Sequence, residues 1–148
     1  MQIAAKPART ALEVSRQIIT AAMKVHSALG PGLLESAYEA CLSHELRKSG
    51  LHVECQVALP VVYEGIQLDI GYRIDLLVEN LVIVELKAID EIAPIHQAQL
   101  ISYLKLARKS LGLMINFHVV HLKDGIKRYV SGKELAMISF VYLRILRG

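Results

Sequence analysis

Two short apolar runs that meet at Glu79-Asn80 constrain the fold of this chain more than any other feature. Residues 71–87 read GYRIDLLVENLVIVELK, with strand-forming Ile, Leu and Val on both sides of two residues typical of a tight turn. The pattern predicts a β-hairpin. Its apolar arms also contain Asp75, Glu85 and Lys87, and charged groups in a buried strand are unfavourable unless they are paired or bound to a metal.

The hairpin would bring these three charged side chains into one cluster. Side chains alternate along a strand, so Glu85 and Lys87 project to one face, and the turn returns Asp75 to the neighbourhood of Glu85. Two carboxylates and a backbone carbonyl make a hard oxygen site of the kind that Mg²⁺ or Mn²⁺ prefers, and an adjacent lysine suits metal-assisted hydrolysis of a phosphodiester. From spacing alone, an ion pair on a half-exposed strand is the commoner explanation, because the pattern is loose.

Length and composition predict one domain, spanning residues 1–148, with a sizeable core. Of the 148 residues, 53% are hydrophobic and 21% are charged, which argues against disorder. No apolar run reaches the roughly 18 residues of a membrane span, and the first residues lack the core of a signal peptide. Cys41 and Cys55 have no metal-ligand spacing to another Cys or His, so we expect a reduced, cytoplasmic protein.

The charge is divided unevenly along the chain. Residues 1–104 contain 8 Lys/Arg and 12 Asp/Glu, whereas residues 105–148 contain 9 Lys/Arg and only 2 Asp/Glu. A basic C-terminal third suits a phosphate backbone. Solvated lysines on a helix and a hairpin would give the same pattern, so both explanations stay open.

Helical periodicity occurs on both sides of the hairpin. We expect helices over residues 11–29, capped by Thr10, over 33–49, and from about 90 to 109. The apolar stripe expected on the first helix comprises Leu12, Ile19 and Met23, with Ile18, Ala22 and Leu29 as further candidates. The core face expected on the second comprises Leu34, Ala37, Tyr38, Cys41, Leu42 and Leu46.

The other segments read as strands. Residues 51–63 predict a half-buried strand, with Cys55 on the apolar side and a bend at Pro60, followed by a turn at 64–65 and an antiparallel meander. Residues 111–117 follow a helix and predict a strand covered on both faces. Asp124-Gly125 predicts a hairpin between strands 119–122 and 126–130.

A last helix is predicted at the C-terminal end of the chain. Residues 131–134 match a capping box that would open a helix over about 131–146. Because this segment is apolar on most sides, we expect it to be buried in the domain or in a partner, and a homodimer contact is one hypothesis.

Three polar residues on the predicted helices are candidates for the charged cluster. Glu35 lies in the first turn of its helix, where the helix dipole alone would favour a carboxylate. Gln99 and Tyr103 are four residues apart and so share a helix face with His96. They can hold a phosphate, a nucleotide or a lysine by hydrogen bonds, or they are simply polar groups at a core margin.

The same segments, in this order, resemble a known family. GLLESAY at 32–38 matches the signature of the GxxExxY proteins at Gly32, Glu35 and Tyr38. The blocks at 71–88, 96–105 and 111–117, followed by KDGIKR at 123–128, are similar to the other family blocks, so the resemblance covers about residues 11–130. The family is assigned to the PD-(D/E)XK nuclease superfamily. This implies an α/β (α+β) fold with a restriction-endonuclease-like core, a mixed sheet with an antiparallel meander flanked by helices.

The resemblance also implies a role for each matching residue. The catalytic residues it implies are Asp75, Glu85, Lys87, Gln99 and Tyr103, the last two matching the Q-x-x-x-Y element of RecB-type and lambda-exonuclease-type members. The metal ligands it implies are Asp75, Glu85, the backbone carbonyl of Leu86, and Glu35. From charge and position rather than from the resemblance, the residues expected to contact nucleic acid are Arg73, Lys105, Lys127 and Arg128. Arg73 could instead form a salt bridge to Glu85 or Glu35. The chain departs from the family at His118, where a glycine is frequent.

Two functions of different classes follow from these observations. The first is a Mg²⁺- or Mn²⁺-dependent nuclease that acts on DNA, in which the crowded carboxylates should raise at least one pKa. The second is a non-catalytic module that keeps the nuclease fold and binds nucleic acid or a protein. A purely structural dimer is a third possibility, and it predicts neither nucleic-acid binding nor metal dependence.

Overall fold

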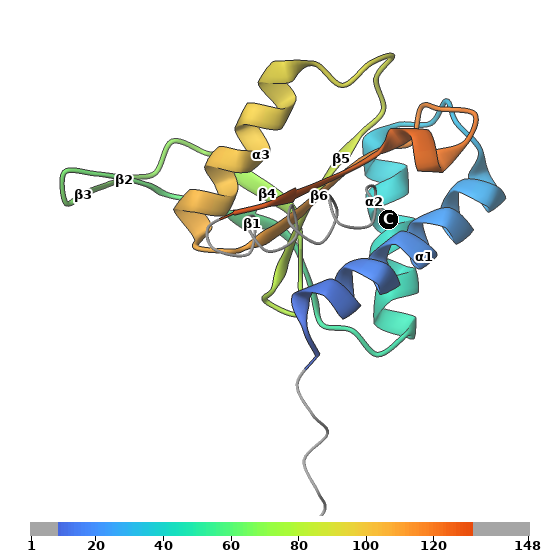
Figure 1. Ribbon diagram of the computed structural model, residues 1–148, viewed down its shortest axis with the longest axis horizontal. Coiled ribbons are helices and arrows are strands. Elements are labelled where there is room, and N and C mark those ends of the chain that lie inside the picture. Colours follow the sequence, from blue (N-terminus) through green and yellow to red (C-terminus); the bar gives the residue numbers. More distant parts are fainter. Residues whose placement is uncertain (1–8, 132–148) are drawn as a thin grey trace, which may run out of the picture.

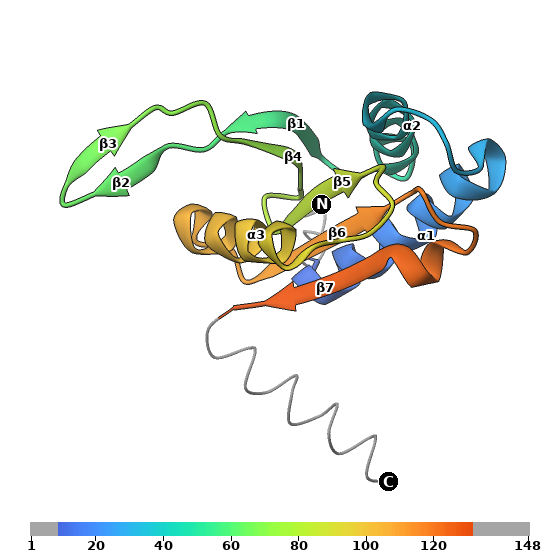
Figure 2. The same ribbon diagram turned by 90° about the horizontal axis from the view of Figure 1, so that it is seen from above.

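The computed structural model describes residues 9–131 and contains a five-stranded sheet with helices on both faces (Figures 1 and 2). Its helices are α1 (Ala11–Leu29), α2 (Glu35–Lys48), α3 (Pro94–Ala107) and the 3₁₀ helix η1 (Leu122–Gly125). Its strands are β1 (Val53–Ala58), β2 (Val61–Tyr63), β3 (Ile66–Leu68), β4 (Arg73–Val78), β5 (Val82–Lys87), β6 (Leu111–Asn116) and β7 (Ile126–Val130). Within the described residues, no helix is long and apolar enough to cross a membrane.

The main sheet is mixed, as predicted. Its strand order is β1-β4-β5-β6-β7, and every neighbouring pair is antiparallel except β5 and β6, which run parallel. A parallel pair needs a crossover connection, and α3 provides it. The fold therefore agrees with a restriction-endonuclease-like core, in which an antiparallel meander and a crossover meet at β5.

Two hydrophobic clusters hold the helices against the sheet. Helices α1 and α2 pack on one face through Ile18, Tyr38 and Leu42, and α3 packs on the other through Leu100 and Leu104. Gly112 allows the close approach of α3, because a Cβ there would lie 3.0 Å from the Leu100 side chain. Strand β5 is thus covered on both sides, which explains its nearly continuous apolar sequence.

The predicted central hairpin is confirmed. Glu79 and Asn80 have φ angles of 53° and 54°, the left-handed conformation that tight hairpin turns require. The Glu79 carboxylate also accepts hydrogen bonds from Arg9 at 2.7 Å and from the backbone N–H of His52 at 3.0 Å. The turn is therefore tied to the segment before α1 and to the start of β1.

The two N-terminal helices form where predicted, but their buried faces differ in part from the expectation. Thr10 caps α1 in a capping box with Glu13, as its sequence position predicts. Leu12, Met23 and Leu29 are 37–38% exposed, because the buried stripe of α1 runs instead through the residues between them. These are Val14, Ile18, Ala21, Ala22 and Val25.

Helix α2 begins at Glu35, two residues later than predicted, and Leu34 is 77% exposed rather than part of the core. Tyr38 explains this start, because its ring stacks on Phe117 at 4.3 Å while its hydroxyl donates to the Gly30 carbonyl at 2.6 Å. The same hydroxyl accepts from the Leu33 N–H at 3.1 Å. Tyr38 therefore holds the loop that delivers Glu35 to the sheet.

The predicted strand over 51–63 divides into two parts. Strand β1 joins the main sheet, whereas β2 pairs only with β3 in a two-stranded arm that extends away from the body (Figure 2). The expectation that Cys55 is buried is wrong, since it is exposed on the edge strand β1. The predicted turn at Glu64-Gly65 connects the two strands of the arm.

The predicted hairpin around Asp124-Gly125 is wrong in its first strand. Strand β7 pairs directly with β6, and residues 119–122 form no strand. The 3₁₀ helix η1 occupies the connection, where a side chain on Gly125 would collide with the backbone carbonyl of Asn116. The predicted last helix and its homodimer contact lie outside the described residues.

Candidate nuclease site

The candidate site lies where the β4–β5 ladder ends. The two strands pair from Val78–Val82 to Leu76–Val84, and beyond that point side chains replace the backbone bonds. The N–H of Asp75 donates to Glu85 Oε1 at 3.2 Å, and the N–H of Leu86 donates to Asp75 Oδ2 at 2.8 Å. The structure therefore brings together the two carboxylates that the hairpin was predicted to join.

Glu85 is the buried member of this pair, with 5% of its surface exposed. Burial raises the pKa of its carboxyl from 4.5 to about 8, and the negative charge of Asp75 adds to the increase. The expected rise in a carboxyl pKa is confirmed, although burial rather than crowding is its largest cause. The nearby ammonium of Lys87 lowers the pKa of Glu85 and so opposes both effects.

Lys87 lies at the end of β5 and is half-buried. Alternation along the strand directs it to the same face as Glu85. Its backbone carbonyl accepts from the N–H of Phe117 at 2.9 Å, which extends the pairing of β5 and β6. Within residues 9–131 its ammonium forms no salt bridge, so it is available to a ligand on this face.

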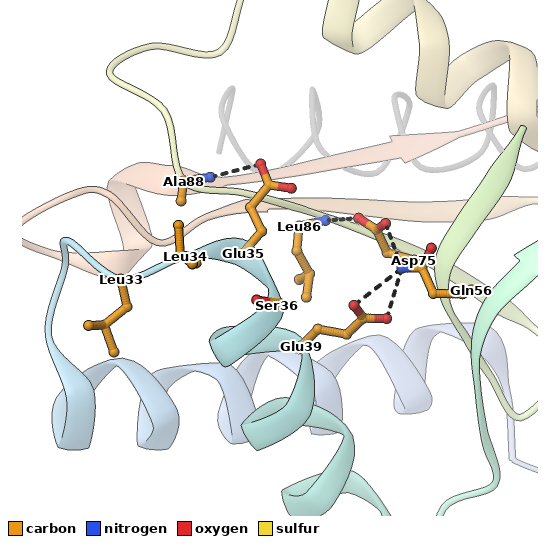
Figure 3. Close-up of a pocket in the computed structure, with 9 residues that line it drawn as sticks. All are labelled: Leu33, Leu34, Glu35, Ser36, Glu39, Gln56, Asp75, Leu86 and Ala88. Atoms are coloured by element: carbon orange, nitrogen blue, oxygen red, sulfur yellow. Dashed lines mark hydrogen bonds between the residues drawn. The ribbon is translucent and has the colours of Figure 1, made fainter.

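A hollow of about 600 Å³ opens between α2 and the strands (Figure 3). Asp75 lines it, and Gln56 donates from Nε2 to Asp75 Oδ1 at 3.3 Å and to the Glu39 carboxylate at 3.0 and 3.2 Å. Glu35 lies at the other end of the hollow, where its Oε1 accepts from the N–H of Ala88 at 3.3 Å. Three carboxylates, those of Glu35, Glu39 and Asp75, therefore line one cavity, and Glu85 is not among its lining residues.

Sequence reasoning missed Glu39 and Gln56. Glu39 is four residues after Glu35, so the helical repeat places both on one side of α2. Gln56 and Asp75 lie between the register pairs Cys55–Leu76 and Val57–Ile74, and Gln56 has a φ of 53°. The first signal was readable from the spacing, whereas the second required the strand register.

Gln99 and Tyr103 meet on the opposite face of the sheet, as their spacing predicts. Gln99 Nε2 donates to the Tyr103 hydroxyl at 3.0 Å. Burial raises the pKa of Tyr103, and the negative charge of Glu85 adds to the increase. His96 has a structural bond instead, because its Nδ1 accepts from the N–H of Ala93 at 2.9 Å.

The four residues assigned to nucleic acid are all exposed, but they do not form one patch around the carboxylates. Arg73 donates to the Gln56 carbonyl at 3.2 Å, so its guanidinium is bonded to β1 and not to Glu85 or Glu35. Lys105 lies on α3. Lys127 and Arg128 lie on the edge strand β7, which β6 separates from β5.

The donor chemistry of the site suits a hard divalent cation. Asp75, Glu85 and Glu35 supply carboxylate oxygens, which Mg²⁺ and Mn²⁺ prefer. Glu85 in particular is a buried carboxyl beside a second carboxylate, an arrangement that a cation would stabilise. Among the described residues, no group of three or more His, Cys, Asp or Glu side chains converges on one point. The residues therefore fit a divalent cation that only some of these three carboxylates contact directly.

Comparison with known protein families gives one match. A family model described as the PD-(D/E)XK nuclease superfamily matches residues 12–129. The matched range runs from the first turn of α1 into β7, so it includes both the hollow beside α2 and the Gln99–Tyr103 pair. Comparison with curated proteins and with solved structures gave no match.

Proposed function

The chain belongs to the PD-(D/E)XK nuclease superfamily, and from this premise we propose that it is a Mg²⁺- or Mn²⁺-dependent nuclease that hydrolyses phosphodiester bonds in DNA. The observation that carries the proposal is the exchange of hydrogen bonds between Asp75 and Glu85 where β4 and β5 separate. We further propose that the chain is a GxxExxY member, on the match at Gly32, Glu35 and Tyr38.

The residues that would hold the cation are Asp75, Glu85 and the carbonyl of Leu86, with Glu35 contacting it directly or through a water. When bound, the cation supplies charge stabilisation at the phosphate and lowers the pKa of a coordinated water. Asp75 also anchors the site mechanically, because its second oxygen accepts the Leu86 N–H and thereby fixes the end of β5. Glu39 and Gln56 keep the other Asp75 oxygen directed into the hollow.

Lys87, Gln99 and Tyr103 complete the proposed site from the α3 side. Lys87 would orient the attacking water and stabilise the negative charge that develops on the phosphate. The Tyr103 hydroxyl accepts from Gln99 and keeps its own proton, which it can donate to a phosphate oxygen or to the water. In this arrangement Gln99 positions Tyr103 rather than Lys87.

The test is cleavage of labelled DNA together with calorimetric titration of Mg²⁺ or Mn²⁺. The parent should cleave only with the cation, and Asp75→Ala should lose at least about a hundredfold in rate while keeping its circular dichroism spectrum. Asp69→Ala, at an exposed position next to the arm, is the matched control and should behave as the parent. An Asp75→Ala protein that cuts as fast as the parent rules out the proposal.

The non-catalytic binding module remains the second candidate, and one observation favours it. With a pKa of about 8, Glu85 is largely protonated at neutral pH, which weakens cation binding by the protein alone. The same titration with DNA present separates the two candidates. Salt-sensitive DNA binding that ignores Mg²⁺ favours the module, whereas cation uptake that requires DNA favours the nuclease.

A further inference from the structure

A second hollow, of about 450 Å³, lies on the α3 side of the sheet beside Tyr72. The residues lining it are Tyr72, Ile95, His96, Ala98, Gln99, Ser102, Tyr103 and Leu106. None of these carries a carboxylate, a guanidinium or an ammonium, in contrast to the acidic hollow beside α2. Its volume lies within the roughly 300–1,000 Å³ typical of ligand sites.

The walls of this hollow are aromatic and aliphatic. The rings of Tyr72 and Tyr103 are 6.0 Å apart at an angle of 59°. Tyr72 is 42% exposed and Ile95 is 71% exposed, whereas Tyr103 is nearly buried. Tyr72 therefore presents a free ring surface of the kind on which flat, neutral rings stack.

Two polar groups of the hollow, those of His96 and Gln99, are oriented by other hydrogen bonds. The N–H of Ala93 donates to His96 Nδ1 at 2.9 Å, so in the neutral ring the proton is on Nε2, which is a donor. Gln99 uses its Nε2 on Tyr103, which leaves its Oε1 as an acceptor. One donor and one acceptor beside a stacking ring match the edge of a nucleobase.

The position of the hollow relates it to the proposed catalytic residues. Tyr103 contributes to both, since it lines the hollow and is one of the proposed catalytic residues. Tyr72 is three residues before Asp75, a separation of at most about 11 Å of chain. A base in the hollow would thus belong to a nucleotide close to the scissile phosphate.

We propose that this hollow binds an unpaired nucleobase beside the scissile phosphate, so that the substrate is single-stranded DNA or a frayed end rather than continuous duplex. The inference rests on the proposed nuclease function. A base within a duplex is paired at its edge and stacked on both faces, so only an unpaired base can enter the hollow and stack on Tyr72.

The test is binding of the full chain to labelled oligonucleotides, with Ca²⁺ in place of Mg²⁺, by fluorescence anisotropy. Tyr72→Ala should weaken binding of single-stranded DNA by about 5- to 150-fold, the usual effect of losing one stacking ring, and leave blunt duplex binding unchanged. Tyr72→Phe keeps the ring and should stay within about twofold of the parent. The matched control is Tyr63→Ala, which removes a tyrosine that is 64% exposed on the arm.

A second readout follows the base itself. 2-Aminopurine placed next to the scissile position should be quenched by the parent and by Tyr72→Phe, but not by Tyr72→Ala. Unchanged single-strand affinity in Tyr72→Ala, or an equal loss on duplex and single strand, overturns the inference.

Cleavage by the same proteins in Mg²⁺ separates this inference from the proposed function. If the parent cleaves DNA, and Tyr72→Ala binds and cleaves single strands as well as the parent does, the nuclease function is supported and the base site is overturned. If the parent binds single strands through Tyr72 but cleaves no DNA, the base site is supported as a recognition site and the nuclease function is overturned. A parent that neither binds nor cleaves DNA overturns both.

Discussion

At the scale of single residues, the site depends on two carboxylates that accept hydrogen bonds from backbone N–H groups, in place of backbone carbonyls. Asp75 and Glu85 each accept an N–H from the opposite strand at the point where the ladder stops. These bonds fix both side chains without using a positively charged partner. The buried Glu85 consequently keeps a proton to unusually high pH, which makes its ionisation visible in the stability of the metal-free protein.

Metal-free protein should become less stable as the pH rises from about 4.5 to about 8. The pKa of Glu85 is about 8 in the folded chain against 4.5 as the ordinary value, so the folded state binds the proton more tightly and loses this advantage as it titrates. The contribution is on the order of a few kcal/mol. Glu85→Gln should flatten this part of the pH profile of the free energy of unfolding, measured by urea denaturation. Glu91→Gln, at an exposed position, is the control and should keep the parent profile. If Glu85→Gln also has the parent profile, Glu85 ionises normally and the prediction is wrong.

Glu39→Gln should weaken Mg²⁺ binding by about tenfold, the lower end of the effect of residues that orient metal ligands. The substitution removes a negative charge from the hollow and disturbs the Gln56 amide that Glu39 shares with Asp75. Calorimetry in the presence of uncleaved DNA measures the change. Glu64→Gln, at the tip of the arm, should bind as the parent does. Equal affinities of Glu39→Gln and the parent would mean that Glu39 serves only the fold.

Asp75 and Glu85 could be predicted to meet because hairpin pairing depends only on the turn and on alternation, both of which are local. The spacing from Glu35 places Glu39 on the same side of α2, but its contact with Gln56 depends on how α2 is rotated against the sheet. The position of Gln56 depends on the register of β1 and could not be predicted. Arg73 shows the same limit, since only the register reveals that its guanidinium reaches the Gln56 carbonyl.

At the scale of elements, α2 is positioned by one tyrosine. Tyr38 is fully buried, stacks on Phe117 of the β6 end, and bridges Gly30 and Leu33 with its hydroxyl. Those bonds set where α2 begins and therefore where Glu35 lies. Tyr38 thus has a structural role that supports Glu35, three residues before it in the sequence.

Tyr38→Phe should lower the free energy of unfolding by about 1–3 kcal/mol, because it removes two part-buried hydrogen bonds, to the Gly30 carbonyl and from the Leu33 N–H, of about 0.5–1.5 kcal/mol each. Urea denaturation measures the loss. The matched variant Tyr63→Phe removes a hydroxyl from an exposed ring on the arm and should change stability by less than about 0.5 kcal/mol. Equal stabilities of Tyr38→Phe and the parent would show that the bridge is dispensable.

Element types were predictable where the periodicity was long and regular, as in α1, α3 and β6. The prediction was wrong where a local turn signal competed with strand pairing. Asp124-Gly125 has the sequence of a hairpin turn, yet the long pairing of β6 with β7 takes precedence and the dipeptide closes a 3₁₀ turn. The separation of β1 from the arm was also unreadable, because Val, Tyr and Ile at 61–66 fit a strand in either sheet.

At the scale of the molecule, the carboxylates of the candidate site and the basic pair Lys127 and Arg128 lie on different parts of the sheet. The carboxylates gather around β4, β5 and α2, whereas Lys127 and Arg128 lie exposed on β7 at the edge. A DNA strand that contacts both would cross β5 and β6. The basic edge would then contribute to affinity, and the carboxylate hollow to chemistry.

Lys127→Gln combined with Arg128→Gln should reduce the salt dependence of DNA binding, lowering the slope of log K against log salt by about 2, or about 1 per phosphate contact. The cleavage rate at saturating DNA should change little. Anisotropy titrations over a range of salt concentrations measure the slope. Lys24→Gln, on the α1 side, is the control and should leave the slope unchanged. A double variant with the parent slope would exclude β7 from the DNA interface.

The crossover through α3 has a consequence for the order in which the chain can fold. The β4–β5 hairpin closes through near neighbours in sequence, whereas β6 can join β5 only after the 23 residues between Lys87 and Leu111 have been traversed. We therefore expect Glu85 to reach its strand while it is still solvated and ionised, before α3 packs on the sheet. Burying it without a cation at neutral pH requires the uptake of a proton, so the last step of folding should consume a hydrogen ion and slow as the solution becomes more alkaline.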